Sequence, residues 1–158
     1  MTRAERIESY SKGYESLINA LKEFPKEMWF FKPAPNRWNI HEILIHIADS
    51  ETNSFARARK IICEPGSAII AYDQDAWAIK TNYESQNVDD ALELFKLLRK
   101  MTYNVIKNLP DKIWSNHIDH SENGKMTLED WLNVYDEHVE VHINQMKKNF
   151  IEWQNSIK

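Results

Sequence analysis

Glycine, proline and cysteine are scarce in this sequence of 158 residues, which contains three, five and one of them. Tight turns and hairpins depend on Gly and Pro, so their scarcity favours long helices over a hairpin-rich sheet. Cys63 has no partner for an internal disulfide, and no CxxC pair offers redox or metal chemistry. The sequence therefore predicts an all-α protein in a reducing, cytoplasmic setting.

Long apolar runs and an excess of positive charge are also missing. No segment approaches the roughly 20 consecutive apolar residues that span a bilayer, and the N-terminus lacks the apolar core of a signal peptide. The formal net charge is -4, and Lys and Arg are interspersed with Asp and Glu, which leaves no basic field for nucleic acid. We expect a single domain over residues 1–158, without a membrane or nucleic-acid partner.

What the sequence does contain is apolar residues at helical spacing in four long stretches, each bounded by capping or breaking residues. The predicted helices run from Thr2 to about Phe24, from Asn39 to before Pro65, from near Asn87 to Leu109, and from Thr127 to about Trp153. The connection between the second and third is long, with one short helical turn expected at 75–80. Residues 111–125 are expected to form a polar loop. Four helices of similar length predict a bundle.

Two histidines of the last helix are the first candidates for chemistry. His138 and His142 are spaced i,i+4, so both rings lie on one face of the helix, close enough to share an ion. Their directions fall within the apolar arc of that helix. Buried imidazoles need partners for their ring nitrogens, and a shared metal ion would provide one.

The second helix offers the third ligand. At about 100° per residue, His46 lies at the border of the apolar stripe, whereas His41 points toward the polar side. His117 and His120 lie in the expected polar loop, where histidines are more often solvated than ligating. A site of three neutral imidazoles keeps the full charge of a divalent ion and leaves a coordination position open.

A seam of polar residues continues from His46 along the same side of the helix; it comprises Glu42, Asp49, Ser50, Asn53 and Arg57. Asp49 or Glu51 is a candidate for the base or for orienting a ligand, and Arg57 and Asn53 are candidates for binding a substrate. Solvation or pairing of these residues within the helix is the alternative. Glu42, Asp49 or Asn53 is also a candidate for a fourth ligand, which would close the site.

Two motifs, WNIHEILIHIADSETNSFAR at 38–57 and GKMTLEDWLNVYDEHVEVH at 124–142, together with YDQDAWA at 72–78, resemble the DinB-like superfamily of metal-binding four-helix bundles, which includes bacillithiol-transferase-like proteins. The likeness covers nearly the whole chain. It implies long crossover connections and a divalent metal, zinc or nickel, on His46, His138 and His142. It also implies a homodimer.

The activity that the resemblance implies is less specific. Our leading hypothesis is a metal-dependent enzyme that transfers a low-molecular-weight thiol to a small electrophilic substrate, because a metal readily deprotonates a thiol at neutral pH. A hydrolase that uses water activated by the same metal is the first alternative. A stress-related helical module with a non-catalytic metal is the second.

Overall fold

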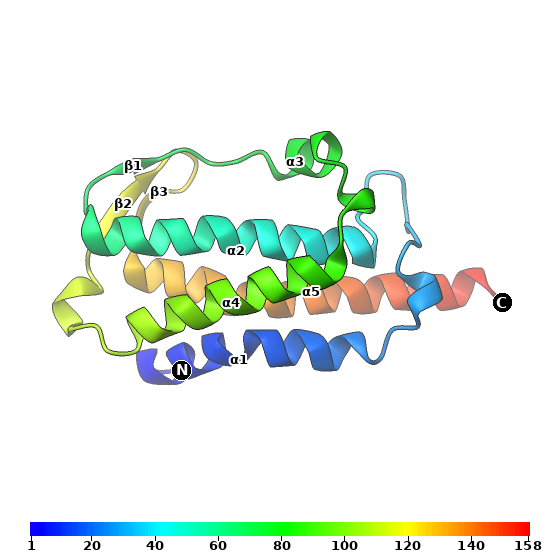
Figure 1. Ribbon diagram of the computed structural model, residues 1–158, viewed down its shortest axis with the longest axis horizontal. Coiled ribbons are helices and arrows are strands. Elements are labelled where there is room, and N and C mark those ends of the chain that lie inside the picture. The colour runs from blue at the N-terminus through cyan, green and yellow to red at the C-terminus, as the bar shows by residue number, and fades with distance from the viewer.

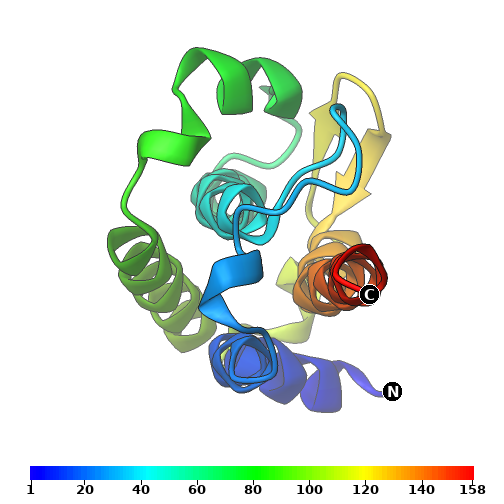
Figure 2. The same cartoon turned by 90° about the vertical axis from the view of Figure 1, so that its right-hand side faces the viewer.

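Four long helices dominate the computed structural model, which describes residues 1–158. These are α1 (Arg3–Leu21), α2 (Ile40–Cys63), α4 (Val88–Ile106) and α5 (Leu128–Ser156), and they lie side by side as a bundle (Figures 1 and 2). The predicted short helical turn is also present, as α3 (Gln74–Lys80). The prediction of a four-helix bundle is confirmed.

Three of the long helices begin at capping boxes. The side chains of Thr2, Asn39 and Thr127 each accept a hydrogen bond from the backbone N–H three residues later, and the acidic residue there bonds back to the cap. Asn87 caps α4 with its side chain alone. Such caps satisfy N–H groups that have no partner within the helix, which is why these boundaries can be read from the sequence.

The order of the helices around the bundle differs from their order along the chain. α1 packs against α4 and α5, and α2 packs against the same two helices, so α1 lies diagonally opposite α2, and α4 lies diagonally opposite α5. α2 and α4 are neighbours that run in the same direction (Figure 1). The chain must therefore return along the whole of α2, whose 24 residues rise about 36 Å, before α4 begins. Residues 64–87, which include α3, make this crossover.

The polar loop expected at residues 111–125 instead contains a hairpin. β2 (His117–His120) pairs antiparallel with β3 (Gly124–Thr127), and β1 (Ala68–Ile69) of the crossover adds a third strand, parallel to β2. Gly124 lies at the turn with φ +67°, a conformation that favours glycine. The polar composition of this segment concealed the strands, which pair with each other over four residues and with β1, about 50 residues away, over two.

Two large apolar clusters, separated by polar groups, fill the bundle core, and a third, smaller cluster lies around Tyr83 between α2, α3 and α4. One large cluster surrounds Phe95 and Ile143, and the other surrounds Trp131 and Ile118. Between them lies Arg99, which is buried together with its partners. Arg99 of α4 bonds there to Glu51 of α2 and to backbone oxygens of α1 and α5, so one polar group joins all four long helices.

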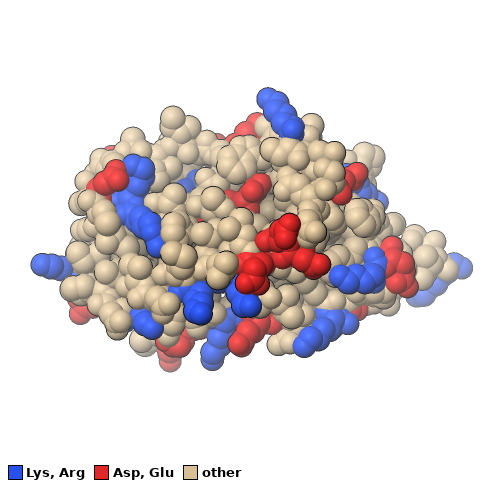
Figure 3. All heavy atoms as spheres, viewed as in Figure 1, with Lys and Arg blue, Asp and Glu red and all other residues tan.

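Neither sign of charge dominates the face of the molecule shown in Figure 3. Lys and Arg are interspersed with Asp and Glu on the face in Figure 3, as the sequence predicted. No helix combines the length and the apolar character that crossing a bilayer requires.

Candidate metal centre

The last helix presents two histidines to its neighbours. His138 and His142 lie one turn apart on α5, and their Nε2 atoms are 3.1 Å from each other. Nδ1 of His142 lies 2.9 Å from the side-chain oxygen of Gln145. Because that oxygen can only accept, Nδ1 of neutral His142 carries the ring proton and the lone pair is on Nε2. His142 is thus held in the tautomer that a metal ion on Nε2 requires.

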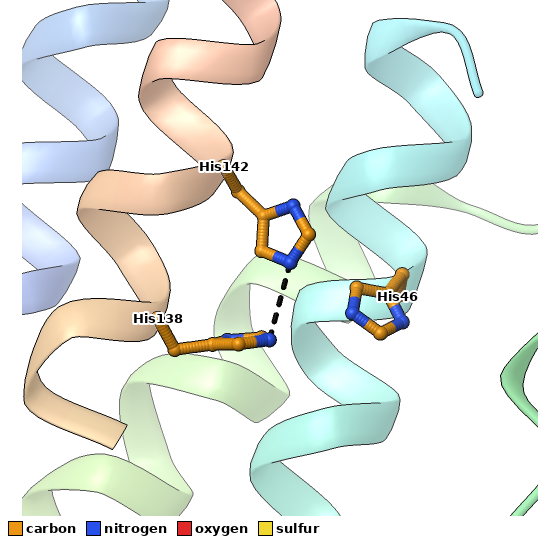
Figure 4. Close-up of side chains that lie close together, drawn as sticks. All are labelled: His46, His138 and His142. Carbon is orange, nitrogen blue, oxygen red and sulfur yellow. Dashed lines mark hydrogen bonds between the residues drawn. The ribbon is translucent and has the colours of Figure 1, made fainter. Parts of the chain in front are cut away.

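The third histidine, His46, faces this pair from α2 (Figure 4). One nitrogen from each of the three rings lies within 4.8 Å of the others. His46 is buried, and its Nδ1 atom has no hydrogen-bond partner. Trp38 packs against the ring, with the ring centroids 4.6 Å apart. The structure brings together the three histidines that the sequence singled out.

All three rings are neutral at pH 7. Burial, with a contribution from His142, lowers the pKa of His46 to about 3, and burial also lowers the pKa values of His138 and His142. Neutral imidazole is the form that binds a metal ion. Zinc–nitrogen bonds of about 2.0–2.1 Å place the nitrogens of a tetrahedral site roughly 3.3 Å apart, close to the separation of the two Nε2 atoms. The donor set therefore fits a divalent metal.

Two residues of the polar seam, Asp49 and Asn53, bond to groups other than the three histidines. Asp49 accepts a hydrogen bond of 2.5 Å from the hydroxyl of Tyr83, and Asn53 donates its amide to the backbone oxygen of Asp49. Glu42, a further candidate for a fourth ligand, caps α2 and pairs with Lys32. No Asp, Glu or Cys side chain belongs to the histidine cluster. The cluster consists of three imidazoles alone.

Glu51 points to a different part of the interior. One of its oxygens accepts from the hydroxyl of Tyr10, and the other lies 2.9 Å from Arg99 Nη2. Arg99 also donates to the backbone oxygens of Tyr10 and Tyr135. Both carboxylate oxygens of Glu51 are thus engaged within a network that joins all four long helices, which favours a structural role for this residue over a role as a base.

Arg57 lies farther along α2 and pairs with neither predicted acid. Its Nη1 atom donates to the hydroxyl of Tyr135 over 2.8 Å, and its Nε atom is buried without a partner. The side chain lines a recess that also contains Tyr72 and His120. The sequence placed Arg57 on the same side of the helix as His46. In the structure its partner Tyr135 lies next to His138 of the cluster, with the two ring centroids 6.2 Å apart.

Two histidines lie elsewhere than the sequence indicated. His41 was predicted on the polar side of its helix but is buried, because its Nε2 atom lies 3.1 Å from the carbonyl oxygen of Tyr83 and its ring stacks on Phe30. His120 is buried as well, although His117 remains partly exposed. Both histidines are covered by segments distant in the chain: Phe30 and Tyr83 cover His41, and the strand of His120 pairs with β1.

Two residues that hold buried side chains in place, Gln145 and Arg99, were not predicted from the sequence, although the sequence contains an indication of each. Gln145 stands three residues after His142, which is the spacing at which helical side chains meet. Arg99 is a charged residue among apolar positions of its helix, between Phe95 and Ile106. A cation at such a position indicates a buried partner.

The comparisons with known proteins agree with this fold. The family model of the DinB superfamily matches residues 9–146. YfiT of Bacillus subtilis, named "Putative metal-dependent hydrolase", is 27% identical over 107 residues, which are 67% of this chain and 60% of that protein. A protein of Oceanobacillus iheyensis with the same kind of name is 24% identical over 67% of this chain and 61% of its own length. A Bacillus cereus relative, also so named, is 23% identical over 91% of this chain and 87% of its own.

One solved structure extends the likeness to three dimensions. The structure of YfiT superimposes with a TM-score of 0.85 at 21% identity, covering 94% of this chain and 87% of that one. It is described as a "probable metal-dependent hydrolase with an unusual four-helix bundle topology". The family model matches residues 9–146, which are most of the chain, and the chain therefore belongs to the DinB superfamily.

Proposed function

We propose that the protein is a metal-dependent hydrolase whose divalent ion is held by His46, His138 and His142. The observation that carries the proposal is the cluster itself, three buried neutral imidazoles from two helices with no acidic side chain among them. A divalent ion bound there would act as a Lewis acid that lowers the pKa of a bound water or thiol and polarises a carbonyl group. The names of the relatives support hydrolysis.

The surrounding residues prepare the site in distinct ways. Gln145 fixes the tautomer of His142, and Trp38 covers one side of the His46 ring. The hydroxyl of Ser50 lies 3.4 Å from Nε2 of His138, the atom that would bind the ion, so this contact would give way when a metal binds. The contacts of Gln145 and Trp38 hold the nitrogens in place before a ligand arrives, which reduces the cost of assembling the site.

Asp49 is the better of the two predicted acids for the role of base. Its Oδ2 atom accepts from Tyr83, and no hydrogen bond occupies Oδ1. Burial and Asp49 raise the pKa of Tyr83, so the phenol stays protonated and keeps donating. Asp49 can therefore take a proton at Oδ1 and become neutral, while the bond from Tyr83 to Oδ2 holds the carboxyl group in position. Replacement by Asn keeps the shape and removes the basicity, so the Asp49→Asn variant should lose about 10²–10⁴-fold in kcat.

Thiol-dependent S-transfer is the second candidate. A site of uncharged ligands leaves the whole charge of the ion available to a thiolate, so the cluster suits a low-molecular-weight thiol as well as water. We expect zinc or nickel as the metal and a small molecule as the substrate. Homodimer formation stays a prediction that sedimentation of the purified chain tests.

Metal content tests the site directly. We expect one equivalent of zinc or nickel per wild-type chain, and a large loss in His46→Ala and His138→Ala, because each removes one of three ligands. His117→Ala is the matched control, since this partly exposed histidine lies in β2 outside the cluster. Unchanged stoichiometric metal in both ligand variants would overturn the proposed site.

Activity separates the candidate functions. The metal-loaded protein is assayed with amide and ester substrates, and with glutathione, bacillithiol or coenzyme A plus a model electrophile. Metal-dependent turnover without thiol supports the hydrolase, whereas turnover that needs a thiol supports the transferase. Stoichiometric metal without either turnover supports the non-catalytic module.

A further inference from the structure

Arg57 is a partly buried cation that lacks an acidic partner. Its guanidinium donates one hydrogen bond, to the hydroxyl of Tyr135, and its Nε atom is shielded from solvent without any partner. Arg99, by contrast, pairs with the carboxylate of Glu51 in the same bundle. A shielded cation without a counter-ion costs free energy that an anionic ligand recovers. The position of Arg57 is therefore prepared for an anion from outside the chain.

The guanidinium lies in a recess of about 550 Å³. α2 contributes Arg57, residues 71–74 of the crossover form a second wall, and His120, Glu122 and Asn123 of the hairpin form a third. Backbone pairing between β1 and β2 holds these last two walls against each other. The recess is thus built by three separate parts of the chain, and it is large enough for part of a small organic molecule.

His120 supplies a second donor in the recess. Its Nδ1 atom accepts hydrogen bonds from the backbone N–H groups of Glu122 and Asn123, at 3.2 and 3.3 Å. The neutral ring therefore carries its proton on Nε2, which has no hydrogen-bond partner in the chain. Burial and the neighbouring Arg57 lower the pKa of His120, so the ring is neutral at pH 7. One charged and one neutral N–H donor thus belong to the same recess.

A short chain of contacts connects the recess with the histidine cluster. Tyr135 accepts from Arg57, and its ring centroid lies 6.2 Å from that of His138. Tyr72 lies on the opposite wall of the recess. Burial raises the pKa of its hydroxyl, and the nearby side chains of Ser50 and Arg57 oppose this rise. Ser50 in turn lies 3.4 Å from His138. A molecule anchored at Arg57 is therefore close to the proposed metal.

We infer that Arg57 and His120 bind one carboxylate group of the substrate, so that the bond to be cleaved lies toward the histidine cluster. This inference rests on the proposed function and assigns it a substrate class, carboxylic acids with a hydrolysable amide or ester. Asp73 and Glu122 also line the recess and oppose a second negative charge. A singly charged carboxylate fits these surroundings better than a phosphate dianion.

Binding to the metal-free chain tests the subsite without involving the metal. We would titrate the full-length protein, treated with a chelator, with N-acetylglycine and with its neutral counterpart N-acetylglycinamide, at constant ionic strength, and follow ¹⁵N-labelled amide and histidine-ring signals. The acid should shift the signals of residues 71–74 and 120–123 and of the His120 ring, whereas the amide should not. Equal effects of the two compounds, or tighter binding of inorganic phosphate than of the acid, would overturn the inference.

Variants assign the binding to Arg57. Arg57→Gln should weaken binding of N-acetylglycine by about tenfold or more, because a charge-assisted hydrogen bond is lost, and Arg57→Lys should lie between the two. Arg59→Gln is the matched control, since Arg59 lies over the ring of Phe55 and outside the recess. Unchanged amide signals away from the recess show that each variant is folded. Equal affinity in wild type and Arg57→Gln would contradict the assignment.

The same variants distinguish this inference from the proposed function. If the metal-loaded chain hydrolyses N-acyl amino acids, Arg57→Gln should lower kcat/KM for the acids but not for the corresponding amides. Hydrolysis with no preference for acids rejects the subsite and leaves the hydrolase. Carboxylate binding that depends on Arg57, without hydrolysis of any substrate, rejects the hydrolase and supports the subsite.

Discussion

Two groups of buried polar side chains lie within the same bundle, and they differ in how completely their hydrogen-bonding groups are satisfied. In the ion-pair network, Arg99 donates to Glu51 and to two backbone oxygens, and Tyr10 completes the coordination of the carboxylate. In the histidine cluster, Nδ1 of His46 has no partner at all. The first group is complete within the chain, whereas the second requires something from outside.

The number of unsatisfied hydrogen-bonding groups distinguishes a structural network from a binding site more clearly than the residue types do. Both groups are polar, buried and contributed by several helices. A buried network whose members are all satisfied stabilises one arrangement of the helices, while an unsatisfied group costs free energy until a ligand binds. The contrast leads to predictions about stability that differ in sign for the two groups.

The largest effect is expected from breaking the ion pair. Arg99→Met leaves Glu51 as a buried charge without a partner, so the free energy of unfolding should fall by about 3–5 kcal/mol, measured with urea on the metal-free protein. The double variant Glu51→Leu/Arg99→Met is the control and should recover most of the loss. A double variant as unstable as the single one would show that the pair itself is not the cause.

Metal should stabilise the histidine cluster and leave the ion-pair network unaffected. At a hundredfold excess over its dissociation constant, zinc should raise the free energy of unfolding of the wild type by about 2.7 kcal/mol. The gain should disappear in His142→Ala and persist in His117→Ala, as measured by urea unfolding with and without zinc. An equal gain in all three proteins would place the metal elsewhere.

Acid should destabilise the metal-free protein through the cluster. The pKa of His46 is about 3 in the folded chain and about 6.5 when unfolded, so the unfolded state binds the proton first as the pH falls. Its contribution is complete above pH 6.5 and is lost below it, at about 1.4 kcal/mol per pH unit. The His46→Leu variant should show a correspondingly shallower decline in unfolding free energy between pH 6.5 and 5.

A smaller effect tests how tightly the ion-pair network is packed. A Cβ atom added at Gly13 would lie 2.1 Å from Nη1 of Arg99, so this atom must move in Gly13→Ala. The overpacking outweighs the helix propensity of alanine, and we expect a net loss of about 1 kcal/mol in unfolding free energy. In an Arg99→Met background the same substitution should be neutral or stabilising, and a loss in both backgrounds would contradict the explanation.

The histidine site could be predicted from the sequence because its information is local. Spacing along one helix identifies His138 and His142, and direction relative to an apolar stripe identifies His46. The capping boxes at Thr2 and Asn39 are equally local, and each helix boundary they predict is confirmed within a residue.

Features that depend on distant segments could not be predicted in the same way. His41 was expected on the polar side of its helix, but Phe30 and Tyr83 pack against it there. Glu51 stands beside Ser50 in the chain, but its pairing with Arg99 depends on a helix 48 residues later. The side of a helix on which a polar residue lies is encoded locally, whereas the partner it meets there depends on the order of helices in the bundle.

The pairing of β1 with β2 has a consequence for how the chain folds. Ala68 pairs with Asp119, and the whole of α4 lies between these two residues in the chain. The pairing therefore joins two connections of the bundle that are about 50 residues apart. Closing a loop of this length costs entropy before any contact compensates for it, and we expect the sheet to form late in folding. The helices can assemble first, and the recess beside Arg57 then becomes complete in the last step.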